Sequence, residues 1–150
     1  MHFRVTSRPT AAWITPQLRE AFPYDQAPRY LILDRDAKYG DDVLAAIRHM
    51  GIAPKQITAR SPWQNGVAER FVNTARRDLL DHVIVLNEKH LQRLLACFAS
   101  YDLGERTHLS LTEDAPAVRA VESKPHPAAE IIALPRLGGL HHRYAWHCAA

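Results

Sequence analysis

The chain is poor in cysteine and has no long apolar run. Its two cysteines, Cys97 and Cys148, fit neither a disulfide framework nor a zinc site of known spacing. No apolar stretch approaches the roughly 20 residues that cross a bilayer, so no membrane partner is expected. The first residues lack both the apolar segment and the cleavage site of a signal peptide. We therefore expect a protein of the reducing cytoplasm.

Internal repeats and low-complexity tracts are also absent, and the composition is that of an ordinary globular protein. Apolar residues make up 47% and charged residues 23% of 150 residues, which is enough chain for one core and too little for two full domains. The net charge of +3 makes the chain mildly basic, which is compatible with a nucleic-acid partner and is weak evidence by itself.

The apolar pattern predicts strands alternating with helices. The expected strands cover 2–6, 29–33 and 56–59, and the expected helices cover 10–22, 41–50, 65–79 and 88–101. Pro16 leaves open a later start for the first helix. This order is typical of an α/β fold with a parallel sheet, in which ligands collect at the carboxyl ends of strands.

The character of the chain changes after Gly104, where prolines interrupt the pattern. We divide the chain into a domain over 1–107 and an extended, partly ordered C-terminal tail over 108–150. Within this tail, 128–134 is a candidate strand, and Gly138-Gly139 permits a turn after it.

Two carboxylates stand out by their positions. Asp34 closes the predicted strand over 29–33, and Glu69 lies near the start of the predicted helix over 65–79, 35 positions later. Acids at a strand end and a helix start can converge on one divalent metal ion, as in phosphodiester chemistry. Helical periodicity places Glu69 opposite the apolar stripe of its helix. That stripe is expected to consist of Val67, Ala68, Phe71, Val72, Ala75 and Leu79.

Three segments carry a resemblance to a known family. Residues 34–39 (DRDAKY), 61–70 (SPWQNGVAER) and 101–111 (YDLGERTHLSL) are similar, in this order, to segments of one catalytic core. The first resembles its Asp-Arg-Gly-x-x-Tyr segment, the second the segment with its final Glu, and the third its Tyr-Asn-x-x-Arg-Pro-His-x-x-Leu segment. This core is that of DDE transposases and retroviral-type (rve-like) integrases, and the resemblance covers about residues 2–120.

The resemblance implies a ribonuclease-H-like fold and DNA integration by a mobile element. Phosphodiester cleavage and strand transfer would depend on Mg²⁺ or Mn²⁺, with Asp34 as a shared ligand and Glu69 as a ligand of one ion. The implied partners are DNA and further subunits, either copies of this chain or intact transposase chains. Six residues are candidates for DNA contacts: Lys38, Arg60, Asn65, Arg70, Arg76 and Arg77.

One family feature has no counterpart in the sequence. The family's first Asp precedes the strand that 2–6 resembles, and the acids before Asp34, which are Glu20 and Asp25, match no such position. We therefore expect a core truncated at its N-terminus, without its first strands, that binds metal weakly and has little or no catalysis of its own. The alternative function is a non-catalytic remnant that binds DNA or transposase subunits.

Each candidate also has a simpler interpretation. Asp34 could start a turn, Glu69 could be a solvated residue at a helix start, and Asp36 could replace Asp34 as a ligand. Asn65 either positions Glu69 or a phosphate, or caps its helix. The cationic side chains could simply be solvated. Trp63 could stack on a base, although packing is the preferred interpretation.

The remaining candidates lie in the helix predicted over 88–101 and in the tail. Cys97 falls near the apolar face of the helix over 88–101 and is expected in the core. A zinc site is a minor alternative, because its residues fit no standard spacing. These residues are His141, His142, His147 and Cys148.

Overall fold

The structure is a computed structural model that describes residues 2–23, 26–118 and 120–148. Its contacts divide the chain into two compact units, Met1–Lys89 and His90–Ala150, which are described separately. The division predicted at 107/108 remains a prediction. Among the described helices, none combines the length and the apolar character that crossing a membrane requires.

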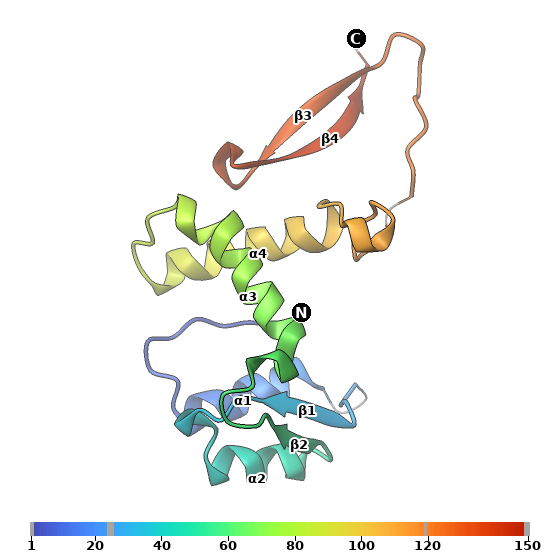
Figure 1. Cartoon of the computed structure of the whole chain (residues 1–150). Helices are drawn as coiled ribbons and strands as arrows, with labels where there is room; N and C mark the ends of the chain where they lie inside the picture. Colours follow the sequence, from blue (N-terminus) through green and yellow to red (C-terminus); the bar gives the residue numbers. More distant parts are fainter. Residues whose placement is uncertain (1, 24–25, 119, 149–150) are drawn as a thin grey trace. The chain divides into compact units, whose positions relative to one another are not determined.

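The first unit is built on a strand–helix–strand arrangement. Strand β1 (Tyr30–Leu33) pairs with β2 (Ala53–Gln56) in parallel, and helix α2 (Asp41–His49) connects them (Figure 1). The parallel pairing predicted from the sequence is confirmed. The strand predicted over 56–59 was placed too late. Gly51, with a φ of 75°, ends the helical segment, and buried Ile52 leads directly into β2.

Helix α1 (Ala11–Ala21) confirms the early start of the first predicted helix. The Thr10 side chain caps it by accepting a hydrogen bond from the Trp13 backbone N–H. Pro16 lies inside the helix and not at its start. The core of the unit consists of buried side chains from α1, α2 and β1, together with the residue before β2. Its members are Ile14, Leu33, Val43, Ile47 and Ile52.

The strand predicted over 2–6 was wrong, because these residues have no regular secondary structure. A β-prone pattern forms a strand only where a partner ladder is available, and here two side chains contact α1 instead. His2 Nε2 lies 3.1 Å from Gln17 Oε1, and an Arg4 guanidinium nitrogen lies 3.4 Å from a Glu20 carboxylate oxygen.

The helix predicted over 65–79 is confirmed. A 3₁₀ turn, η2 (Pro62–Asn65), leads into α3 (Gly66–Asp78), and a second turn, η3 (Leu80–His82), follows. The predicted apolar stripe is only partly buried. Ala75 and Leu79 are buried, whereas Val67 is 88% and Val72 60% exposed. Helical periodicity therefore predicted the buried side at the C-terminal end of the stripe but not at its beginning.

The second unit contains most of α4 (Glu88–Gly104), which extends three residues beyond the predicted end. Near its C-terminal end, Asp102 is buried and accepts a hydrogen bond from Arg106 at 3.0 Å. His108 Nε2 lies 3.3 Å from the Asp102 backbone oxygen, just before η4 (Leu109–Leu111). Much of the segment 101–111 therefore organises the end of α4.

The expected tail contains an ordered antiparallel hairpin. Strand β3 (Glu130–Arg136) pairs with β4 (His141–His147), from Glu130 opposite His147 to Arg136 opposite His141 (Figure 1). The turn between them, η5 (Leu137–Gly139), uses Gly138 and Gly139 at φ values of 70° and 95°. The predicted turn is confirmed, and the strand before it begins and ends two residues later than predicted.

Candidate active site

The carboxyl end of β1 and the turn before α3 meet at two side chains. Asp34 directly follows β1, and Asn65 is the last residue of η2. Asn65 Nδ2 donates a hydrogen bond to Asp34 Oδ1 at 3.3 Å, and both side chains are half-buried. Neither interpretation of Asn65 from the sequence included this contact. Its side chain makes no capping hydrogen bond to α3.

Glu69 lies in the first turn of α3, four positions after Asn65. It is half-buried and lines a shallow hollow on the polar side of α3. The other residues of this hollow are Gly66, Arg70, Asn73 and Arg77. Because residues four apart on a helix share a face, Asn65 and Glu69 belong to one side of this segment.

Asp36 is already engaged within its own loop. It caps η1 (Ala37–Tyr39) by accepting the Lys38 backbone N–H at 3.1 Å, and its other oxygen lies 2.8 Å from Lys38 Nζ. These bonds lower the pKa of Asp36, chiefly through the Lys38 ammonium, which in turn has a raised pKa. Lys38 is therefore paired with Asp36, and Asp36 is a poorer candidate than Asp34 for a metal ligand.

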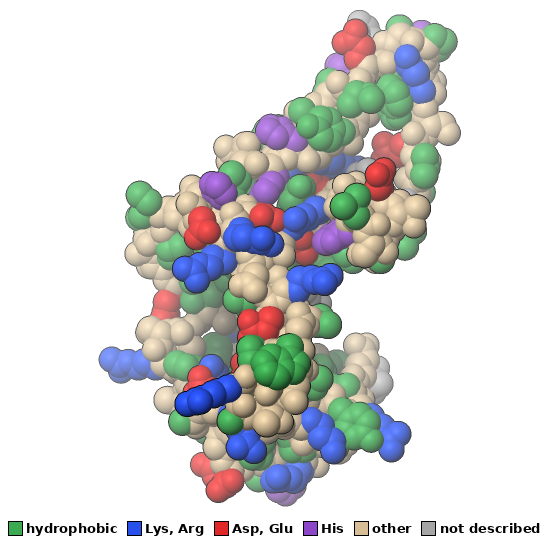
Figure 2. All heavy atoms as spheres, viewed as in Figure 1, with side chains coloured by type: hydrophobic (Ala, Val, Ile, Leu, Met, Phe, Trp, Pro, Cys, Tyr) green, Lys and Arg blue, Asp and Glu red, His purple; other side chains and the backbone are tan. Residues whose placement is uncertain are grey.

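The remaining cationic candidates are exposed and differ in their local surroundings. Arg70 and Arg77 line the hollow beside Glu69, whereas Arg76 lies 3.8 Å from Asp81. Arg60 lies in the loop before η2, in the left-handed region at a φ of 59°. Figure 2 shows Lys and Arg side chains interspersed with Asp and Glu over the visible faces. The positive charge of the α3 arginines is therefore interrupted by acidic side chains.

Trp63 in η2 does not have the packing role preferred from the sequence. Its side chain is 72% exposed. Gln64 takes the structural role in this turn: its side-chain oxygen accepts the Thr58 backbone N–H at 2.7 Å, and its amide nitrogen lies 3.3 Å from Thr58 Oγ1. An exposed indole beside Asn65 is available for stacking.

The carboxylates suit a divalent ion such as Mg²⁺ only as a minimal set. Within the described ranges, no three His, Cys, Asp or Glu side chains form a group that could hold a metal ion. Asp34 and Glu69 supply hard oxygen atoms, and Mg²⁺ commonly binds through one or two carboxylates together with waters and substrate phosphates. The donor chemistry of these residues therefore fits Mg²⁺, with waters and DNA phosphates completing its coordination.

Other candidates from the sequence have different surroundings. Glu20 is paired with Arg4, and Asp25 lies outside the described residues. Cys97, expected in the core, is exposed, because α4 turns this position outward. His141 stacks on Tyr101 with ring centroids 4.6 Å apart. The other residues of the alternative zinc site are all exposed: His142, His147 and Cys148.

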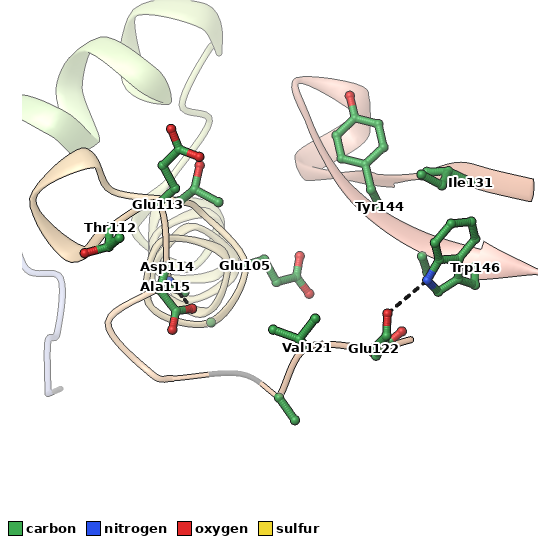
Figure 3. A pocket seen from close by; sticks show the side chains of 14 residues that line it. Glu105, Thr112, Glu113, Asp114, Ala115, Val121, Glu122, Ile131, Tyr144 and Trp146 are labelled. Carbon is green, nitrogen blue, oxygen red and sulfur yellow. Dashed lines mark hydrogen bonds between the residues drawn. The ribbon is translucent and has the colours of Figure 1, made fainter. Parts of the chain in front are cut away.

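The second unit has a pocket of about 430 Å³ that sequence reasoning did not predict. Ile131, Tyr144 and Trp146 of the hairpin line it, and Trp146 Nε1 donates to the Glu122 backbone oxygen at 3.1 Å (Figure 3). Glu105 also lines it, but its carboxylate is bound to Arg136 at 2.7 Å. The charge of Glu105 is thus compensated by Arg136.

Comparisons with known proteins agree with the second and third motifs, which lie within 50–116. Residues 50–116 match the family model described as the integrase core domain. The structure is similar to a chain in the cryoEM structure of the simian T-cell lymphotropic virus intasome in complex with PP2A regulatory subunit B56 gamma. This likeness has a TM-score of 0.51 and 17% identity, and covers 95% of this chain and 54% of that chain. The comparison with curated proteins gives no match.

These findings show a mixed α/β fold in which residues 50–116 resemble the integrase core domain. The resemblance predicted from the three segments is confirmed for residues 50–116, a range that contains Glu69 and Asn65 but not Asp34. The structural likeness extends over nearly the whole chain and fits a ribonuclease-H-like fold. The chain spans about half of the similar intasome chain.

Proposed function

We propose that this chain is part of an integrase or transposase that joins mobile-element DNA to target DNA. The observation that carries this proposal is the contact between Asn65 and Asp34, which joins the carboxyl end of β1 to the segment that leads to Glu69. The match of the segment containing Glu69 to the integrase core domain supports the same assignment.

In this proposal, Asp34 and Glu69 bind a divalent ion together with DNA phosphates. When bound, Mg²⁺ or Mn²⁺ would stabilise negative charge on the reacting phosphate and favour deprotonation of the attacking water or 3′-hydroxyl. Arg70 and Arg77 would hold the DNA backbone beside Glu69, and exposed Trp63 would stack on an unpaired base at a strand end.

Association with further subunits is part of the proposal. The first unit exposes several large apolar side chains outside its core, which is typical of surfaces that bind partners when such side chains are contiguous. Those on α3 are Val67 and Val72, and those in the link to α4 are Ile84 and Leu86. A second copy of the chain or another transposase subunit would cover them.

A second candidate function is DNA or subunit binding without catalysis. The observation that favours it is that the described residues offer no group of three metal ligands. Both candidate functions include the DNA contacts, and they differ only in whether the chain catalyses cleavage and joining.

A joining assay separates the two functions. Purified chain is incubated with labelled duplex DNA in Mg²⁺ or Mn²⁺, alongside the variants Asp34→Asn and Glu69→Gln. Metal-dependent cleavage or joining that both substitutions abolish supports the enzyme. DNA binding without any joining supports the second candidate, and absence of both activities contradicts the proposal.

A further inference from the structure

Asn65 stands where a helix cap is expected, yet its side chain is used elsewhere. Asn is among the preferred residues at the N-cap, where its oxygen would accept a backbone N–H of the first turn. In α3 the N-cap residue is Asn65, and its side chain makes no such bond. Its amide instead donates to Asp34 Oδ1 at 3.3 Å, across 31 positions of sequence.

The neighbouring amide shows that closing this turn does not require Asn65. Gln64 binds both the backbone N–H and the hydroxyl of Thr58, at 2.7 and 3.3 Å. Two consecutive amides in η2 therefore have separate contacts: Gln64 closes the loop, and Asn65 reaches the carboxylate at the end of β1.

We propose that Asn65 is a positioning residue that orients the Asp34 carboxylate for a divalent metal ion. The inference rests on the proposed function and assigns a role that Asn65 plays through Asp34. The hydrogen bond occupies Oδ1 and leaves Oδ2 to bind the ion. Partners that hydrogen-bond to ligating side chains fix their orientation, and their loss commonly costs about 10–100-fold in metal affinity.

The position of Asn65 on α3 extends this role towards the second acid. Glu69 follows four positions later and lines the hollow on the polar side of the helix. A single side chain thus connects Asp34 to the segment that leads into the helix presenting Glu69.

Mn²⁺ binding to the full chain tests the inference without relying on catalysis. The dissociation constant is measured from the electron paramagnetic resonance signal of free Mn²⁺ for wild type, Asn65→Ala and Gln64→Ala. We expect Asn65→Ala to weaken Mn²⁺ binding by roughly tenfold or more. The matched control Gln64→Ala, which removes the adjacent amide, should change it by less than about twofold.

Two further variants separate positioning from folding. Asn65→Ser places another preferred N-cap residue at this position but is too short to reach Asp34, so it should bind Mn²⁺ as weakly as Asn65→Ala while the melting temperature changes little. Asn65→Gln keeps the amide donor and should recover most of the affinity.

Three results would overturn the inference. These are wild-type affinity in Asn65→Ser, equal losses in Asn65→Gln and Asn65→Ala, or a wild-type chain that binds no Mn²⁺. The proposed function is judged separately by DNA binding and joining. If Asn65 governs Mn²⁺ affinity and no DNA is bound or joined, the inference stands and the proposed function fails.

Discussion

Asn65 and Asp34 are 31 positions apart in sequence, and the Asn65 amide donates to the Asp34 carboxylate at 3.3 Å. This bond brings together a strand end and a helix start, the two places from which acids converge on a metal ion in phosphodiester chemistry. The candidate active site is therefore assembled from separate elements, and its DNA-facing side should be the polar side of α3.

The arginines beside Glu69 should contact DNA phosphates. We expect Arg70→Ala and Arg77→Ala each to weaken duplex binding and to reduce the slope of log affinity against log salt concentration by about 1 per lost contact. The control is Arg93→Ala, which removes an exposed arginine of α4. Fluorescence anisotropy at several salt concentrations measures these slopes, and equal slopes in all four proteins would contradict a phosphate contact.

The core of the first unit should depend strongly on Ile47. Its side chain is fully buried at 0% exposure and packs in a cluster with side chains from α1 and β1. Ile47→Ala should lower the free energy of unfolding by about 2–5 kcal/mol. Leu109→Ala, at a position 89% exposed, should change it by less than about 0.5 kcal/mol. Chemical denaturation measures both values, and similar losses would show that the exposed position is covered in solution.

Much of the fold followed from apolar periodicity. The buried positions of α2 and the apolar residues of β1 predicted both elements, because one face of each has to be covered. The strand over 2–6 failed for a different reason: residues such as Val5 favour strands only where a ladder partner exists, and a local pattern does not show whether one does.

The candidate site was less predictable than the fold. The positions of Asp34 and Glu69 indicated acids at element ends, but an Asn before a helix predicts a cap, and nothing local to Asn65 indicates that its amide contacts Asp34 instead. The exposure of Trp63 was missed because a large aromatic residue is mostly buried on average. Long-range contacts and surface coverage depend on the whole fold.

The hairpin of the second unit should be held to α4 by one carboxylate. Glu105 accepts two hydrogen bonds from Arg136 in β3, both at 2.7 Å, and its side chain is only 15% exposed. Because paired charged bonds are stronger than neutral ones, Glu105→Gln should speed amide hydrogen exchange in β3 and β4, by roughly tenfold. The control Glu113→Gln alters an exposed carboxylate nearby. Unchanged exchange in Glu105→Gln would show that the hairpin is held by other contacts, such as the stacking of His141 on Tyr101.

The pair of Asp36 and Lys38 should make stability depend weakly on pH. The bond from the Lys38 ammonium, followed by that from its backbone N–H, lowers the pKa of Asp36 below its ordinary value of 3.8. A lowered pKa in the folded state contributes stability above the unfolded value, and this contribution is lost as pH falls through the folded value. Wild type should therefore melt at a slightly higher temperature than Asp36→Asn near neutral pH, and the gap should close in strong acid.

The same pair predicts an alkaline limit and a dependence on salt. The bond to Asp36 raises the pKa of Lys38 above 10.5, so its contribution is present below that value and is lost as pH rises through the raised one. Both groups lie near the surface, and 1 M salt, with a screening length of about 3 Å, should shrink the gap between wild type and Asp36→Asn. Thermal melts across pH at low and high salt measure this difference in melting temperature. A gap that persists unchanged into strong acid would mean that Asp36 acts through the η1 cap geometry and not through its charge.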